Sequence, residues 1–144
     1  MKACTVMTAI GAVLFACSLA STSASTQASL YDRLGGSPAV SAVVDDFVQN
    51  VAADKRINGF FAHTDIPSFK QKLTDFICVG TGGPCYYGGR DMKTAHAGMG
   101  VRGRDFNALV QDLGRTLKKL KVPHREQMEL VAILAPMKKD IVTR

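Results

Sequence analysis

The chain has 144 residues and a formal net charge of +6, with 47% hydrophobic and 21% charged residues. This length is enough for one domain with its own core. The basic residues are spread out, and their densest group, Lys118, Lys119 and Lys121, has no interleaved aromatic residues. That pattern is typical of a solvated helix face and argues against nucleic-acid binding. Binding to an anionic ligand or an anionic membrane remains an alternative.

The first residues have the pattern of a secretory signal. Lys2 precedes an apolar run over residues 6–19, which small residues follow. The run is too short for a membrane anchor. We therefore expect a signal peptide at 1–24 and an exported, periplasmic mature domain at 25–144 without a transmembrane segment. Cys17 loosely resembles the cysteine of a lipoprotein cleavage box, so lipid anchoring through it is the alternative.

Two cysteines, Cys78 and Cys85, remain after cleavage, with a glycine-rich spacer between them. In an oxidising compartment a disulfide is their expected state, and the flexible spacer permits the close approach that it needs. The rival interpretation is a zinc site that adds His96, but such a site would lack a fourth ligand.

The mature chain then reads as a series of helices. Residues 30–34 predict a single helical turn that ends at a glycine pair. A second helix is expected to begin with Ser37 as its cap and Pro38 at its first position, and to fade at Asp54. Its apolar stripe, at helical spacing, contains Val40, Val43, Val44, Phe47, Val48 and Val51.

Two segments rich in aromatic residues follow. Residues 57–61 predict a tight helical turn that directs Phe60 and Phe61 inward. Thr64 or Asp65 is expected to cap the next helix. One face of that helix carries Phe69, Leu73, Phe76 and Ile77, and a glycine-rich loop comes after it.

A single histidine lies on a short helix between glycines. Asp91 is predicted to cap this helix over residues 91–97, and Gly98 and Gly100 supply the positive φ that ends it. A helix of about two turns between flexible joints would present His96 to a neighbouring group.

Two long helices complete the chain, over 104–121 and 124–142, the second kinked at Pro136. No alternating strand pattern or internal repeat occurs, so the predicted class is all-α. The residues expected to point inward are Phe106, Leu109, Val110, Leu113, Leu117 and Leu120 from the first helix, and Met128, Val131, Ala132, Leu134 and Ile141 from the second.

Two helices before the glycine-rich loop and two after it suggest a helical sandwich, with the His96 helix facing Phe61, Phe69 and Leu73. The loop supplies few large side chains, so a flat apolar cofactor would fill this interior. Imidazole is the usual proximal ligand of haem iron where small gases bind. Covalent haem attachment is disfavoured because the sequence has no Cys-x-x-Cys-His.

Several motifs resemble the truncated haemoglobins, most of all group I. They are, in order, Leu30-Tyr-Asp-Arg-Leu-Gly-Gly36, Val44-Asp-Asp-Phe47, Phe60-Phe61, Gly82-Gly83-Pro84, Met92-Lys-Thr-Ala-His96 and Phe106. The resemblance implies a two-over-two helical sandwich that holds haem b, with His96 as proximal iron ligand and Phe61 against the haem face. It also implies that the haem pocket is lined or supported by Phe60, Phe76, Met92, Met99, Val101 and Phe106. Most of these would also be ordinary residues of the hydrophobic core.

The distal side departs from the family pattern. Many group I members carry a tyrosine directly after the phenylalanine that matches Phe47, and this chain has Val48 there. The polar residues often found on the distal helix correspond to Phe69 and Leu73. Because the distal wall would then be apolar, bound O2 would lack a hydrogen bond worth about 1–3 kcal/mol. We expect faster O2 release than in tyrosine-bearing relatives and a relative preference for CO and NO.

Lys72 is the polar residue expected near the distal face. In some relatives a His or Lys on this turn becomes a sixth iron ligand, so Lys72 is a possible distal ligand. Deprotonating a lysine is costly, which favours a propionate salt bridge or solvation instead. His63 is expected at the surface or the haem edge, and His124 is expected to be exposed.

The resemblance implies a haem protein that reversibly binds O2, CO or NO. The alternative is an enzyme that converts NO to nitrate or acts as a weak peroxidase, and either would need an external reductase because the chain has no flavin or nicotinamide domain. A peroxidase would also need a distal base, which Phe69 and Leu73 cannot supply. These absences favour binding over catalysis. The third hypothesis is a disulfide-stabilised helical interaction domain without haem.

Overall fold

The computed structural model describes residues 27–144, so the predicted signal peptide and Cys17 lie outside the described part. This part is helical without strands: α1 Leu30–Leu34, α2 Gly36–Ala53, the 3-10 helix η1 Asn58–Phe61, α3 Ile66–Gly80, α4 Met92–His96, α5 Gly103–Lys119, α6 His124–Leu134, the 3-10 helix η2 Ala135–Met137 and α7 Lys138–Ile141. The all-α prediction is therefore confirmed. No helix among these is long and apolar enough to cross a membrane.

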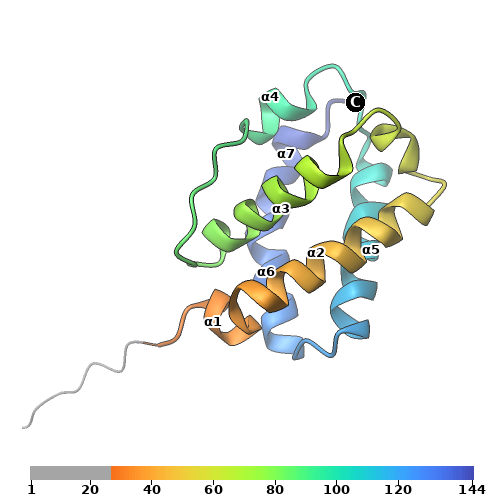
Figure 1. Ribbon diagram of the computed structural model, residues 1–144. Coiled ribbons are helices and arrows are strands. Elements are labelled where there is room, and N and C mark those ends of the chain that lie inside the picture. The colour runs from red at the N-terminus through yellow and green to blue at the C-terminus, as the bar shows by residue number, and fades with distance from the viewer. Residues whose placement is uncertain (1–26) are drawn as a thin grey trace, which may run out of the picture.

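Two antiparallel helix pairs form the body of the domain. Helices α2 and α3 run side by side and cross in front of the second pair, α5 and α6, as Figure 1 shows. Helix α2 also packs against α5. The short α4 lies at one end of the molecule, where it packs against α7. This arrangement is the predicted two-over-two sandwich.

The apolar interior is divided into two clusters. The larger cluster is built mainly from α2 and α5, with Leu30, Ile57, Ile77 and Leu130 contributed by other elements. The smaller cluster joins Val101, Phe106 and Ile141 near α4 and α7. Because α4 is attached to the smaller cluster and α3 to the larger one, the elements that carry the predicted site flank the junction of the two clusters, where Phe60 packs on both.

Most helix boundaries agree with the capping residues. Asp65 accepts a hydrogen bond from the Ser68 backbone N–H at 3.3 Å and caps α3. The kink at Pro136 is confirmed as η2, which separates α6 from α7. The prediction that Ser37 caps α2 is wrong: that helix begins two residues earlier than predicted, at Gly36, after Gly35 in the left-handed region, and has no side-chain cap.

Three residues predicted to point inward are exposed. Leu120 follows the last residue of α5, and the positive φ of Lys121 turns the chain there, so the helical stripe no longer applies. On α6 the buried apolar residue is Leu130, whereas Met128 and Ala132 face solvent. The buried face of α6 is therefore narrower than its apolar residues suggested.

Candidate functional site

Three elements around the predicted site carry large apolar side chains but bury few of them. None of the residues of η1 or α4 is buried, and α3 buries only Ile77 and Cys78. The half-buried apolar side chains of these elements include Phe60, Phe61, Phe69, Leu73, Phe76 and Met92. Since burying such side chains is the main favourable term in folding, this set is suited to packing against a further apolar surface.

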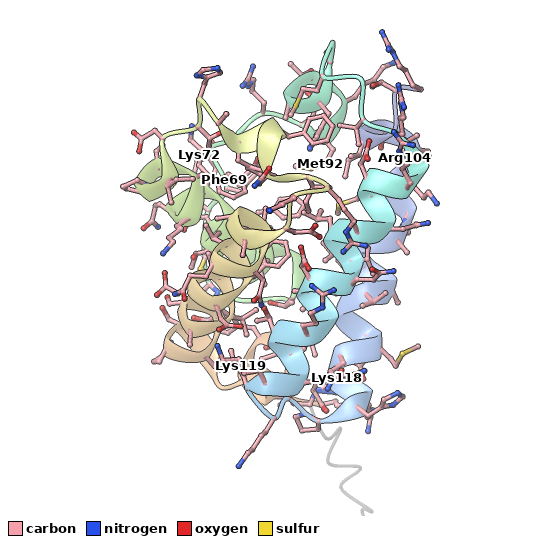
Figure 2. The ribbon with its side chains drawn as sticks, turned by 90° about the vertical axis from the view of Figure 1, so that its right-hand side faces the viewer. Phe69, Lys72, Met92, Arg104, Lys118 and Lys119 are labelled. Atoms are coloured by element: carbon pink, nitrogen blue, oxygen red, sulfur yellow. A yellow bond between two sulfur atoms is a disulfide. The ribbon has the colours of Figure 1, made fainter. Side chains whose placement is uncertain are left out.

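The aromatic side chains form contacts within this set. Phe61 and Phe69 join η1 to α3 with ring centroids 5.4 Å apart. Phe60 packs against both clusters, and Met92 against the smaller one. Figure 2 shows Phe69 and Met92 toward the same end of the molecule, far from Lys118 and Lys119. The α3 side and the α4 side of the predicted pocket thus meet near η1.

A hydrogen bond within α4 fixes the orientation of the His96 ring. Its Nδ1 lies 2.8 Å from the carbonyl oxygen of Met92. A carbonyl can only accept, so Nδ1 carries the proton and donates it, which leaves the Nε2 lone pair of the neutral ring free. Metal-ligating histidines in proteins use this arrangement, in which the second ring nitrogen fixes the tautomer and the ring orientation.

The cap at the start of α4 fixes where His96 stands. The Asp91 carboxylate accepts hydrogen bonds from the Thr94 backbone N–H at 2.9 Å and from the Thr94 hydroxyl at 2.6 Å. These bonds hold the pKa of Asp91 below its usual range. Gly98 and Gly100 have the predicted positive φ after the helix. The predicted capped histidine helix is therefore confirmed, over Met92–His96.

The remaining predicted site residues fall into three environments. Val48, Val101 and Phe106 are buried, the first in the larger cluster and the other two in the smaller. Met99 and Lys72 are exposed. The structure does not bring Phe76 into the same contacts: its ring packs edge-on against Tyr87, with centroids 5.2 Å apart.

Sequence reasoning missed several residues near this site. Val110, Met137 and Val142 pack on the smaller cluster beside Met92. Val110 belonged to the recognised stripe of α5 and could have been assigned to the site. The other two follow the break at η2, and helical periodicity could not place them beside α4.

The predicted disulfide is present and ties the end of α3 to the loop before α4. Cys78 and Cys85 are bonded, with Cα atoms 5.9 Å apart, so their thiols cannot serve the alternative zinc site. Gly83 lies against this bridge, and a Cβ there would stand 2.7 Å from the Tyr31 ring. The Tyr31 N–H also donates to the Thr81 carbonyl oxygen at 2.9 Å. The loop toward His96 is thus fastened at its start.

Comparisons with known proteins agree with this geometry. The family model described as bacterial-like globin matches residues 29–143. The group 1 truncated haemoglobin of Tetrahymena pyriformis is 35% identical over 113 residues, which cover 78% of this chain and 93% of that protein. The corresponding protein of Synechocystis is 36% identical over 121 residues, with coverage of 80% and 98%.

Solved structures give the same result. The Fe(III) form of the truncated haemoglobin from Tetrahymena pyriformis superposes with a TM-score of 0.78 at 34% identity, covering 81% of this chain and 100% of that one. The 2/2 haemoglobin of Synechococcus, solved in the cyanomet state with covalently attached haem, has a TM-score of 0.77 at 36% identity and the same coverage. The chain belongs to the bacterial-like globins and, within them, to the group 1 truncated haemoglobins.

Proposed function

We propose that this protein reversibly binds O2, CO and NO at a haem iron ligated by His96. Haem b as the cofactor follows from the family. The proposal rests above all on His96, whose Nδ1–H is engaged by the Met92 carbonyl oxygen so that Nε2 is available. When bound, haem would supply an iron that the His96 imidazole could hold and that could bind a small gas.

The residues around the pocket would hold the cofactor by apolar contact. Phe60, Phe61 and Met92 are half-buried and lie where the two core clusters approach one another. Covering these side chains with the flat face of a porphyrin would contribute about 25 cal/mol per Å² of apolar surface removed from water. Val101 and Phe106 would support this wall from behind.

The distal residues would bind gases without polar assistance. Phe69 and Leu73 lie on one face of α3 and pack on the larger cluster, which contains Val48. None of these three side chains can donate a hydrogen bond. O2 would therefore leave the pocket faster than it leaves a pocket with a tyrosine hydroxyl, while CO, which depends less on that bond, would be retained relatively well.

Whether Lys72 binds the haem iron decides the coordination number of the iron when no gas is bound. Its side chain is exposed, so we expect it to stay in solvent and leave the iron free to bind gases. A five-coordinate ferrous spectrum would agree with this expectation. A low-spin ferrous spectrum that Lys72→Ala converts to five-coordinate would show instead that the lysine binds the iron.

The visible absorption spectrum of the haem-loaded protein, ferric and ferrous, tests the assignment. We expect His96→Ala to lose or shift the Soret band, because the ring nitrogen that holds the iron is gone. His124→Ala is the matched control, since His124 is exposed at the start of α6, and should give the unchanged spectrum. Identical spectra for all three proteins would refute the ligand assignment, and no haem uptake would refute the function.

A second candidate function is the conversion of NO to nitrate. In this reaction NO, O2 and one electron give nitrate. The reaction requires little from the distal side chains, so it is compatible with an apolar distal wall. Unpaired cations beside α4, described below, favour it because they would help an electron donor to dock. Rapid NO consumption by the O2-loaded protein with a continuing electron supply would support turnover, and stoichiometric consumption alone would support binding.

A further inference from the structure

The charge of the domain is concentrated at one end. We call residues 90–105 together with 138–144 the basic end. It contains seven Lys and Arg residues against three carboxylates, whereas the rest of the described chain has ten against nine. All seven cationic residues are exposed. Nearly all of the net positive charge of residues 27–144 therefore lies on this end.

The two segments of the basic end are joined in space. Helix α4 packs against α7, and both lie at the same end in Figure 1. The backbone N–H groups of Thr143 and Arg144 donate to the Val101 carbonyl oxygen at 2.9 and 3.2 Å. The Lys138 ammonium lies 5.6 Å from the centre of the Phe106 ring. The basic residues thus share one surface.

These cations are largely unpaired within residues 27–144. Only one ion pair of the described chain falls in the basic end, between Arg104 and Asp105 at 3.7 Å, and all the others lie elsewhere. Two of the three carboxylates are also committed to helix caps: Asp91 binds Thr94, and Asp105 accepts from the Arg102 N–H at 2.9 Å. The positive field is therefore not neutralised locally.

The basic end includes the helix that carries the proposed iron ligand. Lys93 precedes His96 by one turn of α4, and Arg102 and Arg104 begin α5 just after the glycines that end α4. The two propionates of haem b would neutralise two positive charges at most, so an excess would persist. An anionic partner that docks here would approach the haem edge.

We infer that the basic end is the docking surface for an acidic one-electron donor protein. This inference rests on the proposed function, because docking matters here only if His96 ligates haem iron. In the complex the partner's reduced centre would give one electron to the ferric iron of bound haem; the partner would be oxidised, the iron would be reduced to ferrous, and no bond would form or break. Attraction between complementary surfaces would accelerate the encounter and position the partner.

A membrane surface fits the observations less well. Interfacial binding combines basic residues with apolar side chains that enter the lipid. Of the large exposed apolar residues in the described chain, Val79, Tyr86, Met99, Leu120 and Met128, only Met99 belongs to the basic end. Many exposed charges with a single exposed large apolar side chain favour a soluble acidic protein.

Charge reversal on two faces of the haem-loaded protein tests the inference. Arg104→Glu/Lys139→Glu changes the basic end, and Lys118→Glu/Lys121→Glu changes the net charge equally at the other end of α5, where Figure 2 shows Lys118 far from Arg104. The donor is a small acidic [2Fe–2S] ferredoxin, and photoreduced lumiflavin serves as an uncharged donor. We expect the ferredoxin rate constant to fall about tenfold in the first variant at low ionic strength, within the usual range of electrostatic steering.

Binding provides a readout that does not depend on electron transfer. Calorimetric titration with oxidised ferredoxin should give a Kd about tenfold weaker for Arg104→Glu/Lys139→Glu and within about twofold of wild type for the control, and high salt should abolish the difference. Equal effects of both variants, or an equal loss with lumiflavin, would overturn the inference. So would binding to phosphatidylglycerol vesicles that the first variant loses while its ferredoxin kinetics stay unchanged. Absence of a Soret band before any donor is added would overturn the proposed function instead.

Discussion

Substitution of Leu73 by glutamine tests whether the distal wall acts through its lack of a hydrogen-bond donor. Leu73 lies one turn after Phe69 on α3 and is half-buried against the cluster that includes Val48. Glutamine has nearly the volume of leucine, and a half-buried position limits the cost of its amide. A net gain of about 0.5–1.5 kcal/mol from one neutral hydrogen bond predicts O2 dissociation about 2- to 12-fold slower.

The assay is stopped-flow displacement of O2 by excess CO, with CO dissociation measured in parallel. Leu73→Met is the matched control, because methionine keeps the size and the apolar surface but adds no N–H donor. We expect it to stay within about twofold of the wild-type O2 rate, since such swaps usually cost little. Equal slowing by both substitutions, or equal changes for O2 and CO, would refute the reasoning and point to steric access instead.

Three further changes concern the support of the site. Cys85→Ser opens the short loop and should lower the free energy of unfolding by about 2–3 kcal/mol in a denaturant titration; an unchanged midpoint would contradict this. Asp91→Ala removes the cap that binds Thr94 and should speed haem transfer to apomyoglobin. The slower haem loss of the wild type should disappear as pH falls through the lowered pKa of Asp91. Burial raises the pKa of Asp112, so wild-type stability should fall as pH rises through that raised value, and Asp112→Asn should flatten this part of the Tm–pH curve.

The sequence allowed most of the helix boundaries to be predicted because side chains next to the backbone specify them. Asp65 and Asp91 cap their helices as expected, and Pro136 interrupts the last one. Ser37 was mistaken for a cap because serine followed by proline is a common helix start. Gly35, in the left-handed region, is the N-cap of α2 instead, and a pair of glycines does not indicate which of them ends the earlier turn.

Burial of polar residues could not be predicted from periodicity. Asp46 is a polar residue between the apolar positions of α2, yet only 8% of it is exposed. It is covered because α5 brings Lys119 and Thr116 to it, and its pKa is lowered chiefly by the hydrogen bond from Lys119. Asp112 is fully buried and binds Arg115 at 2.6 Å. Such positions depend on how two helices face one another, which a single helical pattern does not contain.

The local parts of the site could be predicted from the sequence, whereas the parts that depend on packing between distant segments could not. The His96 helix is a local structure, and its cap, its end and its imidazole follow from neighbouring residues. Its packing partner α7 follows instead from the break at η2, far away in the sequence. The concentration of charge beside α4 likewise arises only when 90–105 and 138–144 meet, so the spread of basic residues along the sequence concealed it.

The division of the core also bears on stability without cofactor. The larger cluster unites α2, α5 and α6, while α4 buries none of its own residues. Elements with few buried contacts open at a low free energy, so α4 should be the least protected helix of the apoprotein. Haem that binds His96 would stabilise it through the concentration-dependent term RT ln(1 + [L]/Kd). The Asp91 cap and the Cys78–Cys85 bridge limit the freedom of the connecting loop beforehand, which lowers the entropy lost when the cofactor binds.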